Sequence, residues 1–354
     1  MPKTIGIIGN KGGFGRWFTS FFKKRGDRVI GSDIGTQLSN QMVTKQADII
    51  LVCVPFSSFE KVVSKDIIPF SQPHQLLMDV MSLKMQPMEI MMRSQADVVG
   101  LHPMWAPKAK SAQGQRCIVI AERLNDTHRT WLDCVLHETG MVLTHSTSRR
   151  HDECVSLTQP PTQALSLALV GVMNIYGVPL AELNLYSSPF SRLHWSLIGR
   201  MLSQKSEVYA DILMNNPRVP ELLCHLEEEI QSIRQIVQRK DYAAFEALFM
   251  EAREYFGVPH INTSSSMFDD MMLFNVDMES INQIQVSSKN APGLLHKISK
   301  ILDRAQVDLT SFHSKLIKEK DRVKFHFGYS QGMDPSAVAS VVRKIKRISN
   351  TTVH

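Results

Sequence analysis

Three glycines at regular spacing near the start of the chain are the first residues that could bind a ligand. Gly9, Gly12 and Gly15 form the pattern GxxGxxG between an apolar run, residues 5–8, and a segment with helical character. Glycines in such a turn allow a tight reversal and a close approach of the backbone to a pyrophosphate, and the first N–H groups of the helix point at the phosphates. The pattern predicts a dinucleotide site, although purely structural turns also collect glycines.

An acidic residue follows the second apolar run at the distance that a ribose ligand requires. Asp33 ends residues 28–33 and lies roughly 20 residues after Gly15. Its carboxylate would accept hydrogen bonds from ribose hydroxyls and repel a 2′-phosphate, and no Lys or Arg follows before Lys45. We therefore predict NAD rather than NADP; the alternative is an aspartate that serves only the turn before Gly35. The residues expected to contact NAD are Gly9, Lys11, Gly12, Gly13, Phe14, Gly15, Arg16, Asp33, Val54 and Pro55.

A histidine and a serine at strand ends could carry proton chemistry. His102 stands near the end of the apolar run 98–103, and Ser82 follows the run 76–80. A neutral imidazole there can accept a proton from a substrate hydroxyl while hydride leaves for the cofactor. Ser82 can orient the imidazole or bind the same hydroxyl. Taken alone, a structural histidine and a helix-capping serine are the simpler interpretation.

These residues require a sheet that brings strand ends together. Apolar runs alternate with helical segments over residues 1–148, which predicts an α/β fold with a Rossmann-type, doubly wound sheet. Residues 149–260 read as an all-helical domain, with a break at Pro160 and Pro161. Residues 261–280 lack a clear period and are expected to be a linker. Residues 281–354 follow the order strand, helix, strand, strand, helix, which predicts a ferredoxin-like domain.

Composition narrows the classes of protein. The formal net charge is +6, but Lys and Arg are spread along the chain, so nucleic-acid binding is not expected. No apolar run approaches the ~18 residues of a membrane span. The five cysteines are scattered without metal-type pairs, so no metal is expected. The chain enters its first apolar run at once, which leaves no room for a signal peptide and favours a cytoplasmic location.

Several motifs together resemble the prephenate dehydrogenase family. Residues 100–104, GLHPM, are similar to its Gly-x-His-Pro-Met signature, and residues 79–84 are similar to Asp-x-x-Ser-x-Lys. The GxxGxxG turn resembles that of the enteric-type enzymes. The resemblance does not extend to the chorismate mutase domain that some of those enzymes carry. His151-Asp152 and residues 198–200, IGR, continue the match, and residues 281–350 resemble an ACT domain, an amino-acid-sensing module.

The resemblance implies NAD-dependent oxidative decarboxylation of prephenate to 4-hydroxyphenylpyruvate, a step of tyrosine biosynthesis. By the motif match, His102 accepts the proton of the ring hydroxyl, Ser82 orients both groups, and Arg200 holds a substrate carboxylate. Arg192 is a second candidate for a carboxylate, and Gln163 stands where the family often has a histidine facing the substrate side chain. Arogenate and 4-amino-4-deoxyprephenate remain alternative substrates. A catalytically inactive, NAD-binding regulatory protein is the alternative of another class.

Two further expectations concern assembly and regulation. The helical region is too apolar for one exposed layer, so a two-fold homodimer is expected. The resemblance to ACT domains implies tyrosine as an effector, bound where helix N–H groups can receive a carboxylate; the alternative is a module that only helps dimerisation. The residues expected at that site are Asn290, Ala291, Pro292, Gly293 and Leu294.

Overall fold

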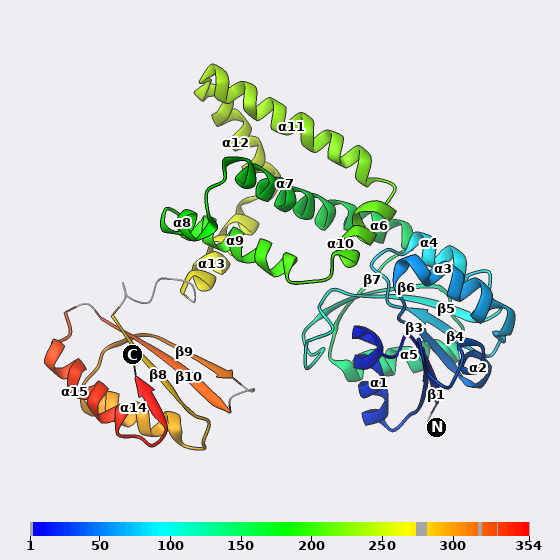
Figure 1. The fold of residues 1–354 in the computed structure, drawn as a ribbon, viewed down its shortest axis with the longest axis horizontal. Coiled ribbons are helices and arrows are strands. Elements are labelled where there is room, and N and C mark those ends of the chain that lie inside the picture. Colours follow the sequence, from blue (N-terminus) through cyan, green and yellow to red (C-terminus); the bar gives the residue numbers. More distant parts are fainter. Residues whose placement is uncertain (1–2, 274–281, 318–320, 331, 354) are drawn as a thin grey trace. The chain divides into compact units, whose positions relative to one another are not determined.

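The computed structural model describes residues 3–273, 282–317, 321–330 and 332–353 (Figure 1). The chain forms two compact units. One comprises Met1–Tyr186 and Arg192–Phe245, and the other comprises Ser187–Ser191 and Glu246–His354. The division between them therefore falls within the predicted helical region, before its expected end at residue 260.

The first unit contains a seven-stranded sheet in the order β2-β1-β3-β4-β5-β6-β7. Its strands are β1 (Thr4–Ile8), β2 (Arg28–Ser32), β3 (Ile49–Val52), β4 (Leu76–Asp79), β5 (Asp97–Pro103), β6 (Arg116–Arg123) and β7 (Val142–His145). The first five are parallel, and the chain changes direction across the sheet between β1 and β3, which confirms the Rossmann-type prediction. β6 runs antiparallel to β5, because no helix separates them to carry the chain back across the sheet.

Helices cover both faces of this sheet, which explains why β3 and β4 are buried at every position (Figure 1). Side chains of α1 (Gly13–Arg25) and α5 (Asp126–Thr139) pack in one core cluster with strand residues. Those of α2 (Asn40–Gln46), α3 (Phe56–Val62) and α4 (Met85–Met91) pack in a second cluster, with the short turns Val63–Ile67 and Ile68–Phe70 between α3 and β4.

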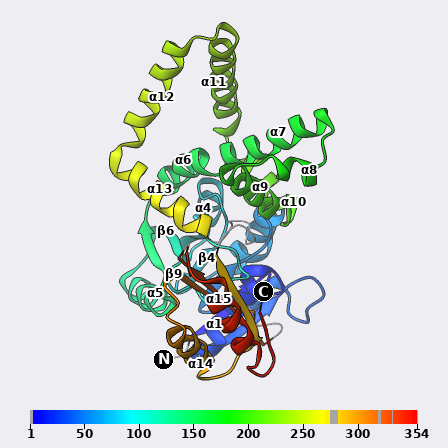
Figure 2. The same cartoon turned by 90° about the vertical axis from the view of Figure 1, so that its left-hand side faces the viewer.

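The predicted helical region is confirmed as helical. Its helices are α6 (Ser148–Thr158), α7 (Pro160–Tyr176), α8 (Leu180–Leu185), α9 (Pro189–Leu202), α10 (Ser206–Asn215), α11 (Val219–Arg239) and α12 (Tyr242–Phe256). The predicted break lies between α6 and α7, where Pro160 is the first residue of the new helix. Within the first unit, α6 and α11 both contact α7 (Figure 2).

The predicted linker, residues 261–280, is largely helical where the structure describes it. α13 covers Val258–Leu273, and residues 274–281 lie outside the described residues. The side chains of residues 258–268 in α13 are mostly exposed, so no apolar period marked this segment in the sequence. Among the described residues, no helix is both long and apolar enough to cross a membrane.

The C-terminal elements confirm the ferredoxin-like prediction and add a short last strand. They are β8 (Gln283–Lys289), α14 (Leu294–Arg304), β9 (Leu309–Ile317), β10 (Arg322–Tyr329), α15 (Pro335–Lys346) and β11 (Thr351–Val353). The strands form an antiparallel sheet in the order β11-β8-β10-β9. Residues of α14 and α15 share a buried apolar cluster with β8 and β10.

Candidate active site

The glycine turn lies at the carboxyl end of β1 and has no room for side chains. Gly9 has φ +86°, and a Cβ on it would lie 2.6 Å from the carbonyl oxygen of Cys53, just past β3. A Cβ on Gly15 would lie 2.0 Å from the carbonyl oxygen of Gly9. Gly12 caps α1 without a side-chain hydrogen bond, so the first N–H groups of that helix remain available for an anion. These features fit the pyrophosphate of a dinucleotide.

Asp33 and Lys11 meet beside this turn. The carboxylate of Asp33 accepts hydrogen bonds from the N–H groups of Lys11 at 2.8 Å and Ile34 at 2.7 Å. The ammonium group of Lys11 donates to the carbonyl oxygen of Ile34 at 2.9 Å. Lys11 was among the predicted NAD contacts, but its place beside Asp33 was not predicted, because the turn brings it there from 22 residues earlier in the chain. A carboxylate and an ammonium group thus lie together just after β2.

The segment after His102 packs against the helix that follows the glycine turn. The ring of Trp105 lies 5.2 Å from that of Phe14 and 4.9 Å from that of Trp17. Pro107 fills the space beside Gly13, where a Cβ would lie 2.6 Å from Cγ of the proline. The end of β5, which carries His102, is thereby tied to the predicted cofactor turn.

His102 is the first of three connected side chains. Its Nδ1 lies 2.8 Å from Nε2 of His151, and Nδ1 of His151 lies 2.6 Å from Oδ1 of Asp152. The two oxygens of Asp152 also accept the N–H groups of Lys84 and Met85, each at 2.8 Å. All three connected side chains are buried. The structure therefore joins the end of β5, the first turns of α6 and the segment between β4 and α4.

Burial lowers the pKa of His102 well below its usual value, and the neighbouring His151 and Lys84 act in the same direction. The ring is therefore neutral near pH 7, as a proton acceptor must be. Its Nε2 has no hydrogen-bond partner among the described residues, and this atom is not completely buried. This nitrogen is the free end of the connected group.

A buried ion pair lies at the end of β4, close to the same groups. Nζ of Lys84 lies 2.6 Å from Oδ2 of Asp79, and both side chains are fully buried. Oδ2 also accepts the N–H of Met81 at 2.8 Å. Burial raises the pKa of Asp79 and lowers that of Lys84, and each group opposes the shift of the other, so each favours the charged form of its partner. A Cβ on Gly100 would lie 2.9 Å from Cδ of Lys84, so this glycine makes room for the pair.

Ser82 is half-buried in the segment between β4 and α4, and within the described ranges its hydroxyl makes no hydrogen bond. The partner of His102 in the structure is His151 rather than Ser82. His151 is 49 residues further along the chain, so strand-end reasoning did not find it. The pair His151-Asp152 near a helix start was the available signal, and it was predicted only as part of the family resemblance.

The other predicted substrate residues lie on the helices, and no hydrogen bond among the described residues connects them to His102. Arg200 is exposed on α9, with Nη1 3.4 Å from Oγ of Ser203. Arg192 is half-buried and has a partner. Gln163 is buried on α7, and its Oε1 has no hydrogen-bond partner in the described part of the chain.

The predicted effector turn lies, as expected, just before α14. Gly293 has φ +74°, a conformation that L-residues rarely adopt, and it caps α14 without a side-chain hydrogen bond. The N–H groups at the start of α14 thus have no cap from that residue.

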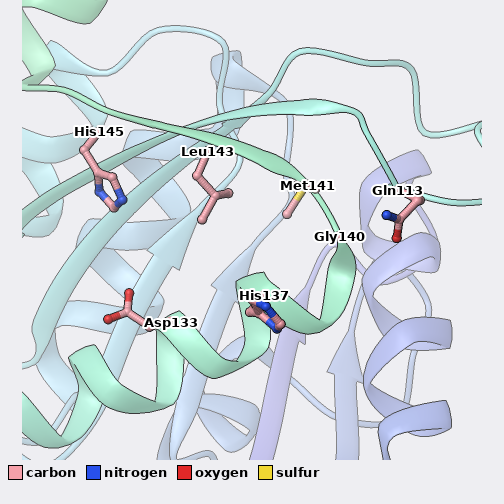
Figure 3. A pocket seen from close by; sticks show the side chains of 7 residues that line it. All are labelled: Gln113, Asp133, His137, Gly140, Met141, Leu143 and His145. Atoms are coloured by element: carbon pink, nitrogen blue, oxygen red, sulfur yellow. The ribbon is translucent and has the colours of Figure 1, made fainter.

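A separate hollow of about 750 Å³ lies beside β7 and α5 (Figure 3). It contains none of the predicted site residues and lies at the β7 edge of the sheet, away from β1. Within the described residues, no cluster of three His, Cys, Asp or Glu side chains could hold a metal ion. The residues that line the hollow are Gln113, Asp133, His137, Gly140, Met141, Leu143 and His145.

Two family models match the chain. "Prephenate dehydrogenase, nucleotide-binding domain" matches residues 22–140, and "Prephenate dehydrogenase, dimerization domain" matches residues 147–251. Both matched ranges end before the C-terminal antiparallel sheet.

Curated proteins of similar sequence carry related names. A probable arogenate/prephenate dehydrogenase of Methanocaldococcus jannaschii is 30% identical over 274 residues, which are 72% of this chain and 61% of that protein. The chain thus spans only about three fifths of this relative's length. A 4-amino-4-deoxyprephenate dehydrogenase of Streptomyces pristinaespiralis is 26% identical over 271 residues, 71% of this chain and 90% of that protein.

Solved structures share the fold. Prephenate dehydrogenase from A. aeolicus, in complex with hydroxyphenyl propionate and NAD+, aligns with a TM-score of 0.59 at 17% identity, covering 71% of this chain and 96% of that chain. Synechocystis arogenate dehydrogenase aligns with a TM-score of 0.53 at 19% identity, covering 70% and 96%.

Proposed function

We propose that this chain, which belongs to the prephenate dehydrogenase family, is an NAD-dependent prephenate dehydrogenase. The reaction is the oxidative decarboxylation of prephenate to 4-hydroxyphenylpyruvate. The observation that carries the proposal is the neutral His102, whose free Nε2 stands at the end of a strand tied to the glycine turn. Arogenate is the second candidate substrate, since the M. jannaschii relative is named for both compounds.

The glycine turn and Asp33 would hold the cofactor. N–H groups at the start of α1 would bind the pyrophosphate, and Asp33 would accept hydrogen bonds from the ribose. A bound nicotinamide cofactor supplies the acceptor for hydride.

His102 would act on the ring hydroxyl of the substrate. Its Nε2 accepts a hydrogen bond from the hydroxyl and takes up the proton as hydride leaves the same ring carbon. When the ring carboxylate leaves as CO2 and its bonding electrons make the ring aromatic, the proton returns to the oxygen, which becomes a phenol. Ser82 would bind the hydroxyl, and Arg200, Arg192 and Gln163 would contact the carboxylates and side chain of the substrate.

Substrate choice is tested by measuring reduced-cofactor absorbance with purified protein and each of prephenate, arogenate and 4-amino-4-deoxyprephenate. We expect turnover that is fastest with prephenate. Faster turnover of arogenate would make the protein an arogenate dehydrogenase of the same family. Cofactor binding without turnover of any of the three would favour the inactive regulatory protein instead.

The first prediction concerns cofactor choice. Asp33→Ser removes the charge that repels a 2′-phosphate and leaves the ammonium of Lys11 beside the ribose site, so the preference for NAD over NADP should narrow by about tenfold or more. The measurement is the ratio of kcat/KM for the two cofactors.

The matched control is the double variant Asp33→Ser with Lys11→Gln. Its kcat/KM for NADP should lose most of the increase expected for Asp33→Ser alone, because the ammonium group is absent. Equal kcat/KM for NAD and NADP in the unmodified protein would contradict the role given to Asp33.

The second prediction concerns Arg200. Arg200→Ala should raise KM for the substrate by about 10–100-fold with little change in kcat, because a carboxylate loses a charged hydrogen-bond partner in both the ground and the transition state. Arg200→Lys should recover part of the loss. Arg239→Ala, at the end of α11, is the surface control. An unchanged KM in the Arg200→Ala variant would show that Arg200 does not bind the substrate.

The helical region is proposed to form a two-fold homodimer. Large apolar side chains on α7 are exposed, including Leu165, Leu169, Val172 and Ile175, the last at 82%. Such a helix buries its apolar surface only against another chain or element. The family model that matches this region is described as a dimerization domain, which supports the proposal.

The third prediction concerns regulation by tyrosine at the turn before α14. We propose that tyrosine inhibits the enzyme, with its carboxylate at the N–H groups that start the helix. Gly293→Val forces a side chain onto a residue with φ +74° and should raise the inhibitory tyrosine concentration by at least about tenfold, leaving the uninhibited rate unchanged.

Gly332→Val is the matched control, because Gly332 has φ +101° elsewhere in the same unit. If tyrosine inhibited the Gly293→Val and unmodified proteins equally, the turn would not be the sensor.

A further inference from the structure

We infer that His151 and Asp152 keep the proton of His102 on Nδ1 and thereby leave Nε2 as the acceptor for the substrate. His151 is then a positioning residue for the reaction proposed above, on which this inference rests. The inference rests on a chain of hydrogen bonds from the imidazole of His102 to that of His151 and on to the carboxylate of Asp152.

The direction of each hydrogen bond follows from the end of the line. Both oxygens of Asp152 accept backbone N–H groups, those of Lys84 and Met85, so the carboxylate is an acceptor toward His151 as well. Nδ1 of His151, 2.6 Å from Oδ1 of Asp152, therefore carries a proton. We take His151 to be neutral, with its single N–H at Nδ1, so its Nε2 is an acceptor. The atom that donates to it, at 2.8 Å, is Nδ1 of His102.

The surroundings keep this line in place. His151 is 1% exposed and Asp152 is 6% exposed, so water does not compete for their hydrogen bonds. The amide of Asn216 donates to the carbonyl oxygen of Asp152 at 3.3 Å, which ties the start of α6 to the segment after α10. The His102 ring thus has one orientation and one tautomer. A carboxylate that orients a histidine in this way is a known requirement of other acid–base sites.

The opposite assignment makes a distinct prediction. Protons on both nitrogens of His151 would direct an N–H at Nδ1 of His102 and move the His102 proton to Nε2. The nitrogen facing the substrate would then be a donor and could not accept the proton of the ring hydroxyl.

The tautomer can be observed without substrate or cofactor. Nitrogen-15 chemical shifts of the full chain labelled at histidine distinguish protonated from unprotonated ring nitrogens, and His102→Asn identifies the signals of His102 by subtraction. We expect a protonated Nδ1 and an unprotonated Nε2 near pH 7. A protonated Nε2 would overturn the inference, whatever the substrate proves to be.

Kinetics test the role of His151. His151→Gln keeps an acceptor where Nε2 was, whereas His151→Leu is of similar size and has none. We expect His151→Leu to lower kcat by about 100-fold with KM and cofactor affinity near those of the unmodified protein, and His151→Gln to stay within about tenfold.

Val155→Ala, a buried change on the same helix, is the control for lost packing. It should lower the melting temperature without a comparable loss of kcat. Equal losses of kcat in His151→Gln and His151→Leu, or a loss confined to KM, would overturn the positioning role.

Discussion

Replacing His102 by Asn is expected to lower kcat by about 10²–10⁴ while cofactor binding stays near normal. The amide of Asn can take the place of Nδ1 and still donate to His151, but no atom of it reaches the position of Nε2. The variant therefore keeps the buried hydrogen bonds and loses only the group that faces the substrate. Steady-state kinetics give kcat. Quenching of the fluorescence of Trp17, on α1, and of Trp105, which packs against it, reports cofactor binding.

His128→Asn is the matched control for this variant. His128 is also a buried histidine with a carboxylate partner, Asp97 at 2.7 Å, but Asp97 is at the other end of β5. This control should cost stability and leave kcat within a few-fold of the unmodified protein. A His102→Asn variant that turned over normally would show that proton uptake occurs elsewhere.

The lowered pKa of His102 also sets the pH range of activity. Its pKa lies well below 6.5, so the ring stays neutral and able to accept a proton as the pH falls past that value. We expect kcat/KM to hold down to below pH 6.5 and to decline only as the ring gains its proton. A decline centred above pH 7 would point to another group.

Lys84→Met is expected to destabilise the protein by about 3–5 kcal/mol, the usual loss when one partner of a buried ion pair is removed. Asp79 would stay fully buried but would lose its partner, the ammonium group of Lys84, which lies 2.6 Å away in the unmodified protein. Met resembles the lysine stem in volume, so little of the loss comes from packing. Urea unfolding of both proteins measures the difference.

Two further measurements identify the cause as the unpaired carboxylate. The double variant Asp79→Leu with Lys84→Met removes both charges and should recover most of the stability. Burial raises the pKa of Asp79 above its value in the unfolded chain, so folding of the single variant takes up a proton. The stability deficit of this variant relative to the unmodified protein is therefore smallest at low pH and grows as the pH rises above about 4. A deficit below about 1 kcal/mol, or one independent of pH, would contradict this account.

Much of the fold and part of the site could be predicted from the sequence because their signals are local. A Cβ on Gly15 would strike the carbonyl oxygen of Gly9, and Gly9 has φ +86°, so the turn itself requires glycine at both positions and leaves a regular spacing in the chain. The continuous apolar runs of β3 and β4 reflect burial on both faces. His102 at the end of β5 was found because parallel strands deliver residues to one edge of the sheet.

What surrounds those residues was decided only by the tertiary structure. Lys11 beside Asp33, His151 behind His102 and Lys84 against Asp79 depend on how turns and helices pack. The apolar periods that predict helices and strands carry no record of which polar atoms meet across them. The sequence by itself therefore determined which elements form and which residue stands at a strand end. Packing decided the partner of each buried polar group, because a hydrogen bond requires two atoms within about 3 Å and the chain between them can have any length.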